Sequence, residues 1–245
     1  TRTLRLAGIG ESQVADLLGE PLLRATDPVV ATYARADAVD VRISARGTAA
    51  DGTSAADRVA STTARVEALL GAYVWAEGAT SWADAIEAAL GGDHRLAVVE
   101  IGTGGSLGAL IGGRDWIRFA ETLSAGTATA GSHASASGLE HLARRAAELG
   151  ESAHAVAVRV RPRGRDTAVS VVVIGPDWVH RERRLAFLGG SNGRLRAALA
   201  AAHVTLAALR AHPEGDAAPR ENLSDAPSGA ARRGRARRSG PARGG

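Results

Sequence analysis

One stretch, residues 95–113, constrains the fold of this chain more than any other. An apolar run from Leu96 to Ile101 ends at a glycine-rich turn, and apolar residues then recur at helical spacing. The pattern predicts a buried strand, a tight loop and the start of a helix. Backbone N–H groups at a helix start can bind an anion. The loop is therefore the first candidate ligand site, formed by Glu100, Gly102, Thr103, Gly104, Gly105 and Ser106.

Strand and helix patterns alternate around this stretch, which predicts an α/β domain over residues 79–211. Strands besides the first are expected at residues 153–160, 167–174 and 184–188, and helices at 82–90, 116–123, 139–149 and 195–209. Residues 125–138 are mostly small and lack the bulk of a core strand.

A smaller α+β unit is expected in residues 1–78. Its strands are predicted at residues 3–9, 29–35, 39–46 and 73–75, with a hairpin at 36–38 and helices beginning at Glu11 and at Ser54. Gly19 and Pro21 are expected to end or bend the first helix.

Residues 212–245 are rich in proline, glycine, serine, alanine and arginine, which predicts a disordered tail. The net charge is +4, and the arginines after Asp225 carry more than all of it. Without these arginines the chain has no excess of positive charge, so it lacks the basic surface typical of nucleic-acid-binding domains. Weak contact with nucleic acid is expected only through the tail, at Arg232, Arg233, Arg235, Arg237 and Arg238.

The composition excludes several kinds of chemistry. The chain has no cysteine and no lysine, which rules out thiol nucleophiles, cysteine-ligated metals, Schiff bases and a P-loop. Its seven histidines are scattered without a metal-binding spacing, so neither a metal nor a cofactor is expected. No apolar run is long enough to cross a membrane, and we expect a cytoplasmic protein. Because methionine is absent, the natural start is expected to lie upstream.

Two short motifs suggest other kinds of site. Gly102, Gly104 and Gly108 fit a dinucleotide fingerprint, but that motif needs an acid on the next strand, and Glu121 falls in a predicted helix. Ser132 and His133 are adjacent, which is not the arrangement of a catalytic triad, and a flexible surface loop is the better interpretation.

The order of the elements resembles the competence/damage-inducible protein A (CinA) family. The segments LRLAGIGES (residues 4–12), DPVVATYAR (27–35), VDVRISAR (39–46) and LLGAYVWAEG (69–78) are similar to successive family motifs. The resemblance implies a KH-like connector followed by a three-layer α/β domain. No GxxG nucleotide clamp is visible in the connector, so RNA binding does not follow from the likeness.

In this family the C-terminal domain is an amidohydrolase that removes the amide of nicotinamide mononucleotide, and its mark is a strand followed by AESCTGG. The corresponding segment here is VVEIGTGG, which puts Ile101 at the position of the family's serine nucleophile. The family's lysine base has no counterpart, since the chain has no lysine. Residues 157–162 are bulky where the family's TGIAGP loop has small residues. The family's Gly-Asp-Arg motif aligns with Gly-Ser-Asn at residues 190–192, and Arg196 is retained.

We interpret the chain as a CinA-like fragment whose deamidase-type domain has lost catalysis and serves as a binding or oligomerisation module. A nucleotide ligand at the glycine loop and a homo-oligomer are the expected partners. Two alternatives remain open. One is an active amidohydrolase in which Thr103 or Ser106 acts with His133 or His154. The other is nucleic-acid association through the tail.

Overall fold

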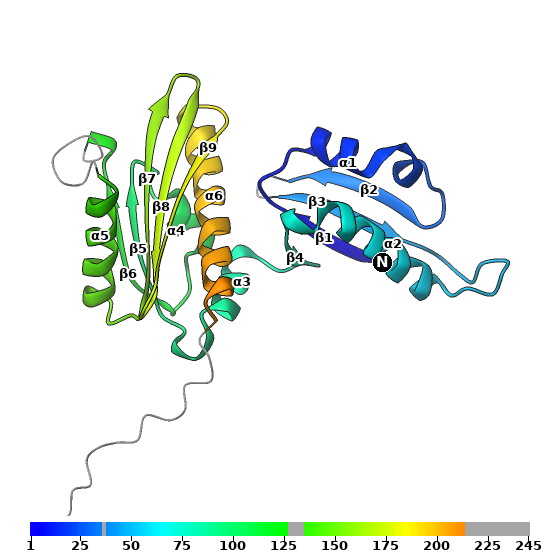
Figure 1. Ribbon diagram of the computed structural model, residues 1–245, viewed down its shortest axis with the longest axis horizontal. Coiled ribbons are helices and arrows are strands. Elements are labelled where there is room, and N and C mark those ends of the chain that lie inside the picture. The colour runs from blue at the N-terminus through cyan, green and yellow to red at the C-terminus, as the bar shows by residue number, and fades with distance from the viewer. Residues whose placement is uncertain (36–37, 127–134, 214–245) are drawn as a thin grey trace, which may run out of the picture. The chain divides into compact units, whose positions relative to one another are not determined.

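The computed structural model describes residues 1–35, 38–126 and 135–213. These residues form two β-sheets, each covered by its own helices (Figure 1). The predicted hairpin at 36–38, the Ser132–His133 pair and the arginine-rich tail lie wholly or mainly outside the described residues. None of the described helices has the length and apolar character needed to span a membrane.

The N-terminal sheet has four antiparallel strands in the order β2-β3-β1-β4. Its strands are β1 (Arg2–Leu6), β2 (Val29–Ala34), β3 (Val39–Ser44) and β4 (Val74–Glu77). The helices α1 (Glu11–Leu23) and α2 (Ala55–Leu70) share one apolar core with this sheet, and a short 3-10 turn, Gly71–Tyr73, leads into β4. The α+β unit predicted from the sequence is confirmed.

Local sequence features account for these elements. In β3, Val39, Val41 and Ile43 alternate with polar residues and are buried in the core that the helices cover. Ser54 caps α2, because its hydroxyl accepts a hydrogen bond of 3.1 Å from the backbone N–H of Asp57. The first helix is bent as predicted, with Gly19 at φ 69°.

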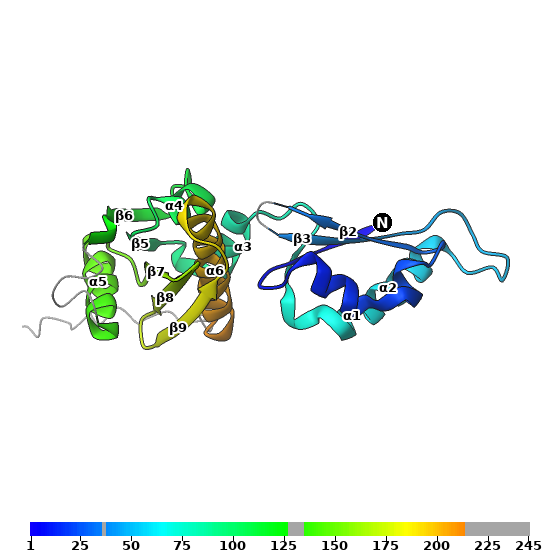
Figure 2. The same ribbon diagram turned by 90° about the horizontal axis from the view of Figure 1, so that it is seen from above.

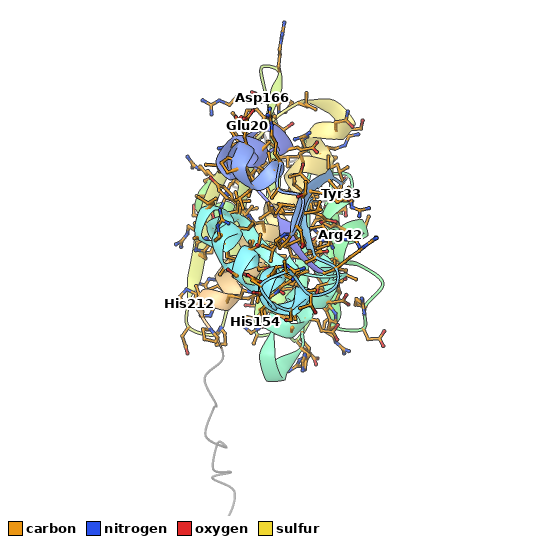
Figure 3. All side chains as sticks on the ribbon, turned by 90° about the vertical axis from the view of Figure 1, so that its right-hand side faces the viewer. Glu20, Tyr33, Arg42, His154, Asp166 and His212 are labelled. Carbon is orange, nitrogen blue, oxygen red and sulfur yellow. The ribbon has the colours of Figure 1, made fainter. Side chains whose placement is uncertain are left out.

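The C-terminal sheet has five strands in the order β6-β5-β7-β8-β9. Parallel pairing joins β5 (Leu96–Ile101) to β6 (Ile117–Leu123) and to β7 (His154–Arg163). The strands β8 (Asp166–Ile174) and β9 (Val179–Ala186) continue the sheet in antiparallel pairing. Figure 3 shows His154, at the start of β7, and Asp166, at the start of β8, toward opposite ends of this domain.

Helices cover both faces of this sheet, which gives the predicted three layers (Figures 1 and 2). On one face, α3 (Trp82–Ala89), α4 (Ser106–Ile111) and α6 (Gly190–Ala211) share a core with alternate strand residues such as Val98. On the other face, α5 (Ala136–Leu149) packs on the intervening residues, among them Val99 and Ile101. A short 3-10 turn at Gly91–Asp93 separates α3 from β5.

Three element predictions differ from the structure. Residues 117–123 form strand β6 rather than a helix, because they pair in parallel with the whole of β5 and alternate in burial with a period of two. The last strand begins at Val179, five residues before the predicted start, and α6 begins at Gly190 rather than at Leu195. In both cases the added residues are mostly polar residues or glycine, so the apolar pattern that signals an element is missing there.

Candidate functional site

The loop 102–105 connects β5 to α4 at the carboxyl end of the parallel strands. Its glycines have positive φ, at 77° for Gly102, 68° for Gly104 and 80° for Gly105. Gly102 is also tightly packed, since a Cβ atom there would lie 3.1 Å from the carbonyl oxygen of Val160 in β7. The loop therefore needs glycine for its backbone and, at Gly102, for its packing.

The carboxylate of Glu100 fills the inside of this loop. The side chain is only 2% exposed. Its Oε2 accepts hydrogen bonds from the Thr103 hydroxyl at 2.5 Å and from the backbone N–H of Leu107 at 2.9 Å, and its Oε1 accepts one from the N–H of Gly108 at 2.7 Å. The expectation that the N–H groups at this helix start point outward to a ligand is therefore wrong for Leu107 and Gly108, which bind the protein's own carboxylate.

The hydroxyl groups of the loop are also committed to the protein. Thr103 is fully buried and donates to Glu100. Ser106 donates to the carbonyl oxygen of Thr103 at 2.8 Å. Both hydroxyls therefore stabilise the loop in its observed shape.

Ile101 lies in the apolar core and not in the site. Its side chain is 0% exposed and belongs to the cluster formed with α5, which includes Leu139 and Leu142. Because neighbouring strand residues point to opposite faces, the side chain of Ile101 lies across the sheet from that of Glu100. A hydrocarbon in a closed apolar cluster has neither the lone pair nor the access that a nucleophile needs.

A shallow cavity of about 440 Å³ lies beside the loop. Its lining is polar and almost uncharged, with one charged side chain, Arg194, in the first turn of α6. The remaining lining residues come from the loop, from the end of β6 and from the segment that follows it: Gly102, Thr103, Gly104, Ser106, Thr122, Leu123, Ser124, Ala125 and Ser191.

Sequence reasoning missed Arg194. A Cβ atom at Gly104 would lie 3.7 Å from the Nε of Arg194, so the exposed guanidinium lies directly beside the loop. Arg196, which the family resemblance indicated, is exposed and is not among the lining residues. Arg194 lies one residue before the predicted start of the last helix at Leu195, so the helical pattern left it out.

The structure separates the loop from the histidine that the sequence offered as its base. His154 pairs with Leu96, the first residue of β5, whereas the loop follows Ile101, the last. Five residues of extended strand span about 17 Å, so the His154 imidazole cannot reach Thr103 or Ser106. His133 lies outside the described residues. No group of three metal-binding side chains occurs in residues 1–35, 38–126 and 135–213.

The dinucleotide alternative fails on its acidic residue. The second parallel strand that this motif requires is present as β6, and Glu121 is part of it. Its carboxylate, however, forms an ion pair of 3.4 Å with Arg145 of α5. The acid that would bind a ribose hydroxyl is therefore engaged on the α5 side of the sheet.

Comparison with known proteins finds relatives of the N-terminal part of the chain. Residues 1–76 match the sequence model described as the damage-inducible protein CinA KH domain. The N-terminal part of the chain is therefore similar to CinA proteins. A CinA-like protein of Deinococcus deserti is 44% identical to it over 111 residues, and one of Deinococcus radiodurans is 38% identical over 109 residues. Both alignments are longer than the KH match, so the likeness to CinA-like proteins continues beyond it.

The alignments cover 44% of this chain and 26% of each Deinococcus protein. The chain thus matches about a quarter of the length of these CinA relatives. Among solved structures, a competence or damage-inducible protein from Enterobacter asburiae is similar over 53% of this chain and 99% of its own, with 14% identity and a TM-score of 0.39, which is too distant a likeness to bear on function.

Proposed function

We propose that the C-terminal domain of this CinA-like chain binds a phosphorylated ligand beside the glycine loop without hydrolysing it. The CinA resemblance points to the nicotinamide nucleotide class. The observation that carries the proposal is the position of Ile101, which is enclosed in the α5-side core where the family resemblance implies a serine nucleophile.

The cavity beside the loop has the chemistry of an anion site. The Arg194 guanidinium can donate two parallel hydrogen bonds to one phosphate group. Gly104 has no side chain to obstruct this approach. The hydroxyls of Thr122 and Ser191 also line the cavity and can donate to phosphate oxygens.

Loss of hydrolysis follows from what the loop residues already bind. The nearest candidate for a relocated nucleophile is Thr103, whose hydroxyl is 2.5 Å from the carboxylate of Glu100. That hydroxyl is fully buried, and both carboxylate oxygens hold backbone N–H groups of α4. A substrate carbonyl cannot approach Thr103 without opening the loop.

Two measurements on the same chain test the proposal. Incubation with nicotinamide mononucleotide is expected to release no ammonia above a no-protein control. Ammonia release that Thr103→Ala abolishes would instead support the active hydrolase with relocated residues.

Binding is measured by titrating nicotinamide mononucleotide and following the affinity calorimetrically. Arg194→Gln is expected to weaken binding by about tenfold or more, since a charge-assisted hydrogen bond is lost. Arg196→Gln, two residues further along the helix and also exposed, is the matched control and is expected to bind like the unmodified chain. Equal affinity of the two variants would contradict the site.

A further inference from the structure

Exposed apolar side chains gather where β9 ends. Leu185 is 44% exposed, Phe187 66% and Leu188 49%. Phe187 is the most exposed large apolar side chain among the residues that the structure describes. Single exposed apolar side chains are common on protein surfaces, but clustered ones mark contact sites with a partner, a ligand or a membrane. We call these three side chains the apolar tip.

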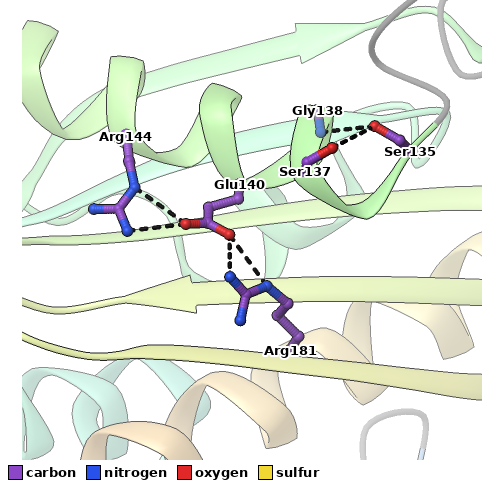
Figure 4. Close-up of polar contacts among 6 residues, drawn as sticks. All are labelled: Ser135, Ser137, Gly138, Glu140, Arg144 and Arg181. Atoms are coloured by element: carbon purple, nitrogen blue, oxygen red, sulfur yellow. Dashed lines mark hydrogen bonds and ion pairs between the residues drawn. The ribbon is translucent and has the colours of Figure 1, made fainter.

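The helix α5 covers the neighbouring part of the same sheet but not the apolar tip. Ser135 caps this helix, and Glu140 in its second turn binds Arg181 of β9 and, at 2.9 Å, Arg144 (Figure 4). Because side chains alternate along a strand, Leu185 points to the same face as Arg181, yet it is exposed. Figure 1 shows the turn between β7 and β8 at this end of the domain, beyond the start of α5.

Hydrogen bonds hold the apolar tip against the start of β8. The backbone N–H of Leu188 donates to the carboxylate of Asp166 at 3.2 Å, and its carbonyl oxygen accepts a hydrogen bond of 2.9 Å from the Thr167 hydroxyl. Leu188 has a φ of 73°, a left-handed conformation that is unfavourable for leucine. The two exposed side chains of Phe187 and Leu188 are therefore presented by a hydrogen-bonded backbone and not by a frayed end.

The charge beside the apolar tip is mainly positive. Arg163 and Arg165 belong to the turn between β7 and β8, and both are exposed. A Cβ atom at Gly189 would lie 3.5 Å from the carbonyl oxygen of Arg165, so this turn lies next to the tip. Residues 155–165 and 185–196 contain no aspartate or glutamate. A partner that fits this end of the domain has both an apolar part and negative charge.

This combination distinguishes between possible partners. A second copy of the chain that docked here through the same surface would place arginines against arginines. Nucleic acid offers negative phosphates but no apolar layer for the leucines. A membrane that contains anionic lipids offers negative headgroups directly above apolar acyl chains.

We propose that the apolar tip, together with Arg163 and Arg165, binds the surface of an anionic lipid membrane. The arginines contact the headgroups, and Phe187 and Leu188 enter the boundary between headgroups and acyl chains. The apolar side chains and the arginines lie at one end of the domain, so they can meet one surface together. The chain then lies on the membrane and does not cross it.

The test places a polarity-sensitive fluorescent label on the apolar tip of the full chain. The chain has no cysteine, so Leu188→Cys provides a single labelling site. Vesicles of phosphatidylcholine mixed with phosphatidylglycerol are expected to shift the emission to the blue, and vesicles of phosphatidylcholine alone to shift it much less. Because the label reports only its own surroundings, vesicles that bind the arginines after Asp225 do not produce this shift.

The same label at Leu149→Cys is the matched control. Leu149 is also an exposed leucine, but it is the last residue of α5 and lies near the start of β6, since a Cβ atom at Gly150 would lie 3.0 Å from the Cβ of Phe119. Its emission is expected to stay unchanged with either kind of vesicle.

Further substitutions in the chain labelled at residue 188 test each part of the surface. Phe187→Ala, and Arg163→Gln combined with Arg165→Gln, are each expected to raise the lipid concentration at half-maximal shift by about fivefold or more. Arg118→Gln removes an exposed charge near the start of β6 and is expected to leave that concentration unchanged.

Three outcomes would overturn the proposal. The first is the absence of a blue shift with the anionic vesicles. The second is an equal shift for the labels at residues 188 and 149. The third is an equal shift when poly-glutamate replaces the vesicles, which would indicate an acidic protein as the partner.

Discussion

The carboxylate of Glu100 accepts a 2.5 Å hydrogen bond from the hydroxyl of Thr103, and both side chains are buried. Two backbone N–H groups of α4 donate to the same carboxylate. The turn after β5 is thus held in shape by an internal anion, whether or not a ligand lies outside it.

Replacing Glu100 with glutamine tests this internal anion. The amide NH₂ would face a backbone N–H or the threonine hydroxyl, so one buried donor would lose its acceptor. We expect the free energy of unfolding to fall by about 1–3 kcal/mol in urea denaturation. The control Glu121→Gln removes a half-exposed ion pair and is expected to change it by less than about 0.5 kcal/mol. Equal losses would show that Glu100 does not support the loop.

Ile101→Ser installs the side chain that the family resemblance places at this position. We expect no ammonia release from nicotinamide mononucleotide, because the new hydroxyl would face the α5 core. We also expect a loss of about 2–5 kcal/mol in the free energy of unfolding, against about 0.5–1.5 for the control Ile101→Val. Ammonia release by the serine variant would show that this position can face the site.

Gly102→Ala tests the close approach of the loop to β7. The alanine would have to keep the φ of 77° that Gly102 has, and its Cβ would lie 3.1 Å from the Val160 carbonyl oxygen. Gly47→Ala is the control, with φ 63° and no atom within 4 Å of the added Cβ. Backbone strain costs each variant about 1–2 kcal/mol of unfolding free energy. The Gly102 variant is expected to lose about 1 kcal/mol or more beyond that. Similar losses would mean that Val160 yields freely.

His203 in α6 predicts a pH dependence of stability. Burial lowers the pKa of His203 below the ordinary value for histidine, and the charge of Arg184 adds to this effect. The unfolded chain then binds a proton at a higher pH than the folded chain does, so the stability present above about pH 6.5 is lost as the pH falls. We expect the thermal unfolding midpoint to fall between pH 7.5 and about pH 5, and to fall less steeply for His203→Gln than for the unmodified chain. The exposed His141→Gln is the control, and identical slopes for both variants would contradict the assignment.

Most of the fold could be predicted because its strands and helices carry clear periodic patterns. Segments such as residues 96–101 and 55–70 are apolar at the spacing of the structure they adopt. Residues 117–123 were misassigned because their sequence suits a helix equally well, and only pairing with β5 decides the matter. A strand partner distant in sequence leaves no local signal.

The glycine loop could be predicted from the sequence, but its internal contacts could not. The glycine loop stands out in the sequence, and its residues do lie together. That Glu100 turns inward to cap α4 depends on the path of the helix after the loop. The position of Arg194 beside the loop was not predictable either, since it depends on how the tertiary fold brings α6 to the end of β5.

Because β9 is an edge strand of the C-terminal sheet, its side chains affect whether a second molecule can pair with the sheet there. Its residues 180–184 are all ionisable, and arginine predominates among them. A second molecule that extended the sheet here by backbone pairing would place two arginine-rich strands side by side. That repulsion guards the edge against open-ended stacking, and it directs any self-association of the chain to a different surface.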